Sequence, residues 1–490
     1  MLSALLLALQ VAPPPPPPAP PAMHAAIAPR VHIHQPRPPH IGSHMIRAIG
    51  GGPGPDSATV AGFLASLAET PVTVCGMAVA MLGNGWDGDG SPNQVSALRD
   101  DAVSQREIRR RLQSPLQDRR AIPLLAASLG RPEPCVRRAA AKMLGGSDLP
   151  EASKALHAGL RQADPRTREA AALGIGVMAD TAAFDELVLA LGDRDPDVIR
   201  MAAWALGNLE DARAVVPLAK LVDASDVGVR AAVAGALGEI EDARGVKPLL
   251  GLLRDRDVGV RAAAARSLGE IEDSSATPGL VQALSDGDGT VRLAAVEALG
   301  EIESPKAAGP LAALLKDPVP DVREATARAL GQVEDRGAVP ALIRALQDQA
   351  PAVRAAAAEA LGSIEDPAAA DALGRAVADP EIDVRREAIS ALGRLDDLHA
   401  APAGLLAAVR DRDPELRRMA AEALGHIGDP GSIAALASLL RDQSSEVRRE
   451  AVSALGEIED DAVTVHLVAA MKDSDAGVRR AAAEALGDRH

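Results

Sequence analysis

The sequence predicts an all-α, right-handed solenoid of about fourteen two-helix repeats, preceded by a disordered N-terminal segment rich in proline and histidine. Three observations predict this fold. The pattern V-R-x-A-A-x-x-A-L-G returns at a constant interval, apolar residues inside each unit follow helical spacing, and only 1% of the chain is aromatic although 47% is hydrophobic. A core of Ala, Leu, Val and Ile suits closely stacked, regular helices.

A glycine marks the period, and in nearly every unit an arginine stands eight positions before it. Successive marking glycines are thirty-one residues apart, as Gly238 and Gly269 are. The interval is one residue longer only between Gly393 and Gly425. Ile199 interrupts the arginine series. Projected backward, the frame reaches Gly83 and Ser114 with a weaker pattern, as is usual for terminal repeats. The marking glycines are Gly145, Gly176, Gly207, Gly238, Gly269, Gly300, Gly331, Gly362, Gly393, Gly425, Gly456 and Gly487.

Each unit is expected to contain two amphipathic helices. Between Val229 and Ile240, apolar residues at offsets 0, 3, 4, 7, 8 and 11 share one helical face, and a shorter run follows from Val246 to Leu253. Asp-Pro pairs such as Asp195-Pro196 suit an N-cap followed by proline at the first helical position. The marking glycine has no Cβ, so the next helix can approach closely.

The unit resembles the short HEAT-like repeat named after phycobilisome lyases, and residues 226–253 read D-V-G-V-R-A-A-V-A-G-A-L-G-E-I-E-D-A-R-G-V-K-P-L-L-G-L-L. The resemblance covers about residues 60–490. It implies the fold but leaves the function open, because that family includes bilin lyases, the metal-dependent deoxyhypusine hydroxylase and adaptors without catalysis.

Four segments are expected along the chain. Residues 1–12 (MLSALLLALQVA) resemble the apolar part of a signal peptide, although no Lys or Arg precedes the apolar stretch. Residues 13–56, rich in Pro, His and Gly, are expected to be a disordered linker. Residues 57–130 form degenerate repeats and residues 131–490 the regular array. We expect export to the periplasm or the exterior, with a cytoplasmic location as the alternative.

The two cysteines are expected to be free thiols. Cys75 and Cys135 fall two repeats apart in the frame. Neighbouring helices stack about 8–10 Å apart, whereas a disulfide requires Cα atoms within about 7 Å.

The function class favoured by the sequence is a non-catalytic protein-binding scaffold that uses the concave face of the solenoid, without cofactor, metal site or catalytic residues. The first alternative is a HEAT-repeat enzyme related to bilin lyases or to the hydroxylase, but none of the ten histidines precedes a glutamate, and the chain lacks the aromatic lining that a bilin would need. The second alternative is a mechanical spacer in a cell-envelope assembly.

The partner is expected to be a protein or peptide. A net charge of −16 argues against nucleic acid, because phosphate binding requires clustered Lys and Arg. The N-terminal apolar run is too short to span a bilayer. We expect a monomer.

The recurring arginines have two interpretations: an anion-binding ladder, or a structural ladder in which each arginine pairs with an aspartate. The structural interpretation is favoured, since aspartates recur just before the arginines, such as Asp226, Asp257 and Asp288, or Asp317, Asp348 and Asp379. The predicted ladder consists of Arg230, Arg261, Arg292, Arg323 and Arg354.

A partner is expected on the helix positions seven and three before the glycine and one after it, which lie opposite the core. Trp204 is the sole aromatic residue there, and the alternative is that it folds down over its own repeat. The predicted binding residues are Trp204, Arg200, Asn208, Leu173, Lys142 and Arg266.

Overall fold

Helices joined by short turns make up the described part of the chain. The computed structural model describes residues 56–68, 116–395 and 398–487, all within the compact unit Gly50–His490. These ranges contain 25 α-helices and no strands. The predicted leader 1–12, nearly all of the linker 13–56, and the sequence around Gly83 and Ser114 lie outside them.

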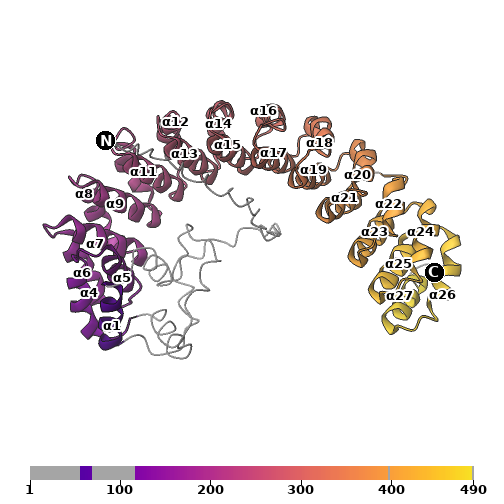
Figure 1. Ribbon diagram of the computed structural model, residues 1–490, viewed down its shortest axis with the longest axis horizontal. Coiled ribbons are helices and arrows are strands. Elements are labelled where there is room, and N and C mark those ends of the chain that lie inside the picture. The colour runs from indigo at the N-terminus through magenta and orange to yellow at the C-terminus, as the bar shows by residue number, and fades with distance from the viewer. Residues whose placement is uncertain (1–55, 69–115, 396–397, 488–490) are drawn as a thin grey trace, which may run out of the picture. The chain divides into compact units, whose positions relative to one another are not determined.

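Short and long helices alternate along the chain from residue 122 onward, and form twelve consecutive pairs in the described residues. Figure 1 shows the two kinds of helix in two separate layers. A further helix, α1 (Ser57–Ala68), precedes them. The long helices are α5 (Pro134–Gly145), α7 (Pro165–Met178), α9 (Pro196–Asn208), α11 (Val227–Glu239), α13 (Val258–Glu270), α15 (Gly289–Glu301), α17 (Pro320–Val333), α19 (Pro351–Ile364), α21 (Ile382–Arg394), α23 (Pro414–Ile427), α25 (Ser445–Glu457) and α27 (Ala476–Gly487). The short helices are α4 (Ile122–Ser128), α6 (Pro150–Leu160), α8 (Phe184–Ala190), α10 (Val215–Ala219), α12 (Val246–Leu252), α14 (Thr277–Ala283), α16 (Ala308–Leu314), α18 (Val339–Ala345), α20 (Ala370–Ala376), α22 (Ala403–Ala408), α24 (Ile433–Leu439) and α26 (Thr464–Ala470).

Packing connects each helix to its neighbours in the array. A short helix packs mainly on the long helix that follows it, and each long helix packs on the next long helix. The predicted all-α solenoid of two-helix repeats is confirmed. Each two-helix unit therefore consists of a short helix followed by a long helix. The boundary between units lies at the 3-10 turns that precede most short helices.

Asp side chains begin many of the long helices. Asp195 accepts the backbone N–H of Asp197, directly before Pro196 at the first helical position, so the predicted cap is confirmed. Asp226 caps α11 in the same way by accepting the N–H of Val229. These carboxylates satisfy backbone donors that have no partner inside the helix.

A left-handed residue ends most long helices, three positions after the marking glycine. Glu303 has φ of 50° and Glu334 has φ of 53°, while glycine occupies the same position only at Gly428, where φ is 67°. This conformation is the usual stop for a helix, because it turns the chain out of the helical path. The recurring Glu-Asp pair therefore works as a stop followed by a cap, since the aspartate after the glutamate caps the next 3-10 turn, as Asp335 does.

The marking glycines are contact points between successive long helices. A Cβ added to Gly331 of α17 would lie 2.9 Å from the Cα and 3.0 Å from the Cβ of Ala360 in α19. Such separations are too short for carbon atoms, so only glycine fits here. The expectation that the glycine allows a close approach of the next helix is confirmed.

The core runs between the two layers and is aliphatic. In one unit Val229, Val233, Leu237 and Leu249 are each no more than 1% exposed. Burial of such side chains contributes about 1.5–3 kcal/mol each. Within the described ranges no helix combines the length and apolarity that a bilayer crossing requires.

Cys135 corrects one prediction, because it is disulfide-bonded rather than a free thiol. The chain has one other cysteine, Cys75, which lies outside the described residues. The separation argument required regular stacking from Cys75 to Cys135, yet around Ser114 the sequence keeps little of the repeat pattern. A spacing derived from regular units does not constrain such a stretch.

Candidate partner-binding face

The positions seven and three before the marking glycine, and one after it, form a continuous stripe on the long helices, which we call the long-helix face. They recur at every fourth position and therefore share one side of each helix. Arg266, Glu297 and Glu422 are exposed here, while Lys142 and Leu173 are half-buried. The stripe is accessible on successive helices because the core faces the opposite side.

Trp204 of α9 is half-buried and packs against the core. Its ring lies over Gly176 in the preceding long helix α7, where an added Cβ would come 2.5 Å from Cζ3 of the indole. The side chain thus contacts the preceding repeat. Gly176 provides the space that fixes the ring in this position.

Arg200 and Asn208 lie on α9 with Trp204, one turn to either side. Arg200 forms an ion pair with Asp197 on the same helix, which directs its guanidinium toward the start of α9. Asn208 is the last residue of α9 and is half-buried. Of the six predicted binding residues, the structure groups these three on one helix, and places Lys142, Leu173 and Arg266 on α5, α7 and α13.

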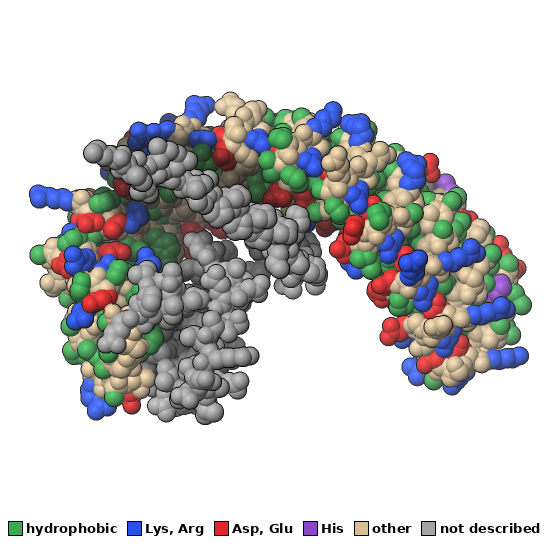
Figure 2. Space-filling model, in the orientation of Figure 1, with side chains coloured by type: hydrophobic (Ala, Val, Ile, Leu, Met, Phe, Trp, Pro, Cys, Tyr) green, Lys and Arg blue, Asp and Glu red, His purple; other side chains and the backbone are tan. Residues whose placement is uncertain are grey.

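Acidic side chains gather on the long-helix side of the array, as Figure 2 shows for the middle and later repeats, whereas many Lys and Arg side chains extend from the short-helix side. Partial burial raises the pKa of Glu297, and the nearby charge of Arg266 in part opposes that rise. Burial likewise raises the pKa of Glu387, which lies beside the stripe, one position after Arg386, with a further contribution from the charge of Glu359. Glu297 on this face and Glu387 beside it are therefore partly desolvated carboxylates.

Nine of the arginines eight positions before the glycine form ion pairs between neighbouring units, which we call rungs. Each of the nine donates to the aspartate 25 residues later, or 26 for Arg385, with N–O distances of 2.6 to 2.9 Å. Arg137 pairs instead with Glu169, and Arg479 donates to backbone oxygens. The described residues contain nine: Arg168–Asp193, Arg230–Asp255, Arg261–Asp286, Arg292–Asp317, Arg323–Asp348, Arg354–Asp379, Arg385–Asp411, Arg417–Asp442 and Arg448–Asp473.

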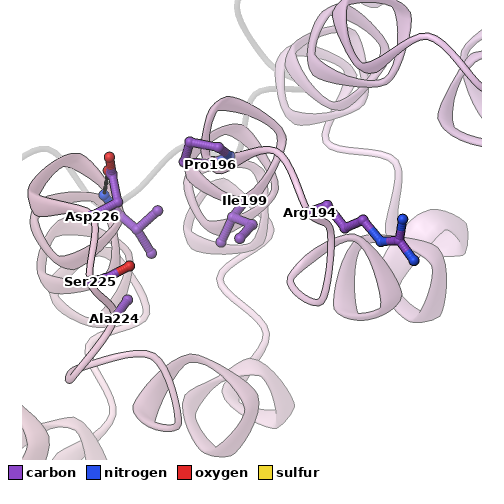
Figure 3. Close-up of a pocket in the computed structure, with 7 residues that line it drawn as sticks. Arg194, Pro196, Ile199, Ala224, Ser225 and Asp226 are labelled. Carbon is purple, nitrogen blue, oxygen red and sulfur yellow. Dashed lines mark hydrogen bonds between the residues drawn. The ribbon is translucent and has the colours of Figure 1, made fainter.

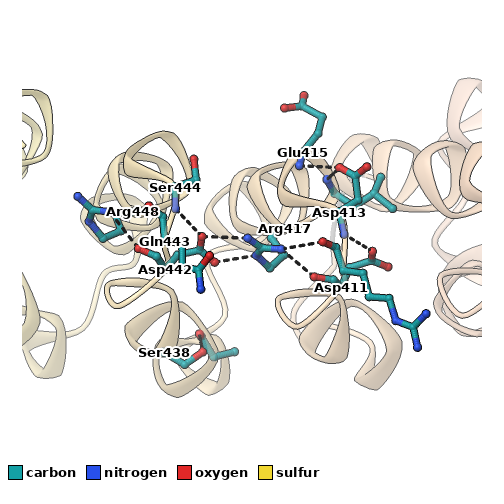
Figure 4. Close-up of polar contacts among 12 residues, drawn as sticks. Asp411, Asp413, Glu415, Arg417, Ser438, Asp442, Gln443, Ser444 and Arg448 are labelled. Carbon is teal, nitrogen blue, oxygen red and sulfur yellow. Dashed lines mark hydrogen bonds and ion pairs between the residues drawn. The ribbon is translucent and has the colours of Figure 1, made fainter.

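One rung shows how the pair is held (Figure 4). Arg417 donates from Nε and Nη2 to both carboxylate oxygens of Asp442, and from Nη1 to the backbone oxygens of Asp411 and Arg412. Oδ1 of Asp442 also accepts the N–H of Ser444. The pair is thus anchored to two turns, one in the arginine's own unit and one in the next.

The two sets of aspartates expected to pair with the arginines have different roles. Asp226, Asp257 and Asp288 cap the N-termini of α11, α13 and α15. Asp317, Asp348 and Asp379 do pair, each with the arginine of the preceding unit. The arginine side chain reaches forward to the following unit because it lies on the side of the helix that faces that unit. The partners are hence the aspartates two positions before these caps.

His157 of α6 lies between two carboxylates, a feature that the sequence did not reveal. Its Nδ1 is 3.0 Å from Oε2 of Glu186, and its Nε2 is 3.2 Å from Oδ2 of Asp180. The two ring nitrogens point to different carboxylates and connect α6 to the following unit. In the described part of the chain, no three His, Cys, Asp or Glu side chains are grouped to share a metal ion.

The family model described as HEAT repeats matches seven stretches of the chain, at residues 91–176, 153–238, 184–260, 219–300, 246–330, 309–393 and 402–487. The chain is a HEAT-repeat protein. The family membership predicted from the repeat pattern is confirmed. No curated protein matches this HEAT-repeat protein in sequence.

Several solved structures are similar to this HEAT-repeat protein. An engineered protein is 24% identical with a TM-score of 0.41, and the match covers 69% of this chain and 98% of that one. The complex of CpcE and CpcF of phycocyanin lyase from Nostoc sp. PCC7120 is 26% identical with a TM-score of 0.30, covering 48% and 91%. The complex of Kap95p with RanGDP is 15% identical with a TM-score of 0.48, covering 89% and 66%.

Proposed function

We propose that this HEAT-repeat protein is a non-catalytic scaffold that binds a protein or peptide partner on the long-helix face around Trp204. The observation that carries the proposal is the position of the indole. It is the aromatic side chain of a stripe of otherwise aliphatic, polar and charged residues, and packing over Gly176 fixes its orientation. A large, partly exposed ring that is already ordered loses little entropy on binding, which is typical of interface anchors.

Replacing Trp204 by alanine is expected to lower partner affinity by at least about tenfold, because buried tryptophans dominate binding at interfaces. The measurement is quantitative affinity capture from an extract of the source organism, comparing wild type, Trp204→Ala and Leu189→Ala. Leu189 is the matched control, since it is an apolar residue of the short-helix layer with 78% exposure. Partners retained equally by all three proteins would contradict the proposal.

A second variant separates loss of binding from loss of packing. Trp204→Ala leaves a space over Gly176 and could therefore weaken the packing of the fold. Reduced capture by this variant counts as a loss of binding only if its thermal unfolding matches that of the wild type. Arg266→Glu changes the same face at an exposed position. Reduced capture by Arg266→Glu with an unchanged melting curve would support the long-helix face independently.

We also propose that the protein is exported, in keeping with the apolar leader at residues 1–12. The disulfide at Cys135 supports this proposal, because disulfides persist mainly in oxidising compartments. Protein isolated from its native cells without reductant and then unfolded is expected to contain no thiol that reacts with N-ethylmaleimide. After reduction both cysteines should react, and reactive thiols in the unreduced protein would contradict export.

A further inference from the structure

The ladder is interrupted at one unit between Arg168 and Arg448, and both partners of the rung change together. Ile199 occupies the arginine position, and the residue 25 positions later is Ala224 instead of aspartate. A lost arginine alone would leave a partly buried carboxylate without its counter-ion, which is costly. The paired replacement removes the charge from both sides and leaves apolar side chains where a guanidinium and a carboxylate would meet.

An open pocket of about 390 Å³ occupies this place. Figure 3 shows Pro196 and Ile199 of α9 opposite Ala224, Ser225 and Asp226 in the turn that leads into α11, while the guanidinium of Arg194 points away. Ile199 remains half-buried, whereas Val229 behind it is 1% exposed. The array therefore does not close over the missing rung.

Position 199 also lacks the guanidinium that donates to backbone oxygens in the neighbouring units. There, Nη1 of Arg168 donates to the oxygen of Gln162 at 2.9 Å, and Nη1 of Arg230 donates to the oxygen of Ala224 at 2.8 Å. The equivalent oxygen for position 199 belongs to Asp193, six positions earlier. The side chain of Ile199 has no N–H to donate to it.

One carboxylate, that of Asp226, stands among the residues that line the pocket. Asp226 is exposed at its edge, and only Oδ1 of this carboxylate is used to cap α11, through the N–H of Val229 at 2.9 Å. The whole chain carries a net charge of −16. Ile199 and Pro196 offer apolar surface against which the methylene groups of a long cationic side chain can pack.

We propose that this pocket binds an arginine side chain of a protein partner, whose guanidinium takes the place of the missing rung. The inference rests on the proposed scaffold function and names the chemistry of one contact. Arginine fits better than lysine, because a planar guanidinium supplies several donors at fixed angles to the carbonyl oxygens and to Asp226, whereas an ammonium is a single point charge. In the neighbouring units a guanidinium occupies the equivalent place, where an aspartate is its partner.

The test uses saturation-transfer NMR on the full chain with the capped pentapeptide Ala-Ala-Arg-Ala-Ala as probe. Transfer to the arginine δ-methylene is expected for the wild type and should fall at least about fivefold in the double variant Ile199→Arg, Ala224→Asp. This variant restores the sequence of a rung and keeps the net charge, so nonspecific attraction is unchanged. Its melting temperature is expected to equal or exceed that of the wild type. The single variant Ile199→Arg, which supplies its own guanidinium, should lose the signal as well.

Three results would overturn the inference: no transfer in the wild type, transfer in either variant as strong as in the wild type, or equal transfer to a peptide with citrulline in place of arginine. Citrulline has nearly the same shape but no charge. The peptide experiment requires no cellular partner, so its failure would leave the scaffold proposal standing. Conversely, a failure of Trp204→Ala to alter capture would leave the pocket standing.

Discussion

Replacing Gly331 by alanine is expected to destabilise the stacking of α17 on α19 by about 2 kcal/mol, although alanine is the better helix former by about 1 kcal/mol. The new Cβ would lie 2.9 Å from the Cα of Ala360. Because the atom in the way belongs to the backbone and not to a flexible side chain, one of the two helices has to move. Urea unfolding followed by circular dichroism measures the loss. Hydrogen exchange should show that the faster-exchanging amides are those of α17 and α19.

Gly235→Ala is the matched control. Gly235 lies in the long helix α11, and a Cβ added there meets no atom within 4 Å. This substitution is expected to stabilise the protein by up to about 1 kcal/mol through helix propensity alone. If both alanines shifted the urea midpoint in the same direction, the close helix approach would not explain why glycine marks the repeat.

Breaking one rung is expected to cost about 2 kcal/mol, whichever partner is removed, because hydrogen bonds to charged groups are worth about 1.5–3 kcal/mol. Arg323 and Asp348 are suitable, since their side chains are 14% and 13% exposed and pair at 2.7 Å. Arg323→Ile and Asp348→Ala each leave a partly buried charge, whereas the double variant copies the natural Ile199 and Ala224. The double variant should therefore be more stable than the sum of the single effects predicts, by about 1–2 kcal/mol. Additive effects would contradict a direct pair.

The rung also predicts a pH dependence with a definite sign. Hydrogen bonds from Arg323 lower the pKa of Asp348, and burial opposes them only in part. A carboxyl group with a lowered folded pKa stabilises the fold fully above its unfolded pKa of about 3.9, and this contribution is lost as the pH falls through the folded value. The difference in unfolding free energy between wild type and Asp348→Ala should accordingly be constant from pH 7 to about pH 5 and shrink toward pH 2.

Much of the fold could be predicted because the same apolar spacing and the same glycine recur in every regular unit. The spacing of Val229, Val233 and Leu237 fixes the buried face of a helix, and the interval between glycines fixes where successive helices meet. The partners of the arginines could not be identified in this way, since two columns of aspartate recur two positions apart. Which of them lies near the arginine depends on how far one unit is displaced from the next, and the sequence does not contain that displacement.

The irregular features required the structure for a different reason. Sequence alone singled out Ile199 and Trp204, but not Ala224, which has meaning only once the spacing between the two partners of a rung is known. The contact of Trp204 with Gly176 depends on a side-chain rotamer, and the disulfide at Cys135 involves a residue type that does not recur from unit to unit. A repeat pattern predicts features that recur in each unit, and it does not predict a contact or bond that is found in a single unit.

The rungs join each unit only to the next one, so whole units can be deleted or duplicated without loss of pairing. Consider the deletion of one whole period between two equivalent positions, such as residues 270–300. Asp317 would then follow Arg261 at the same separation in sequence as Asp286 does now, so Arg261 would again have a partner. Duplicating such a block would preserve every rung as well. The array can therefore lengthen or shorten by unequal recombination without passing through a poorly paired ancestor. The unit that contains Ile199 is the exception, because copying or deleting it would change how many vacant rungs the molecule presents.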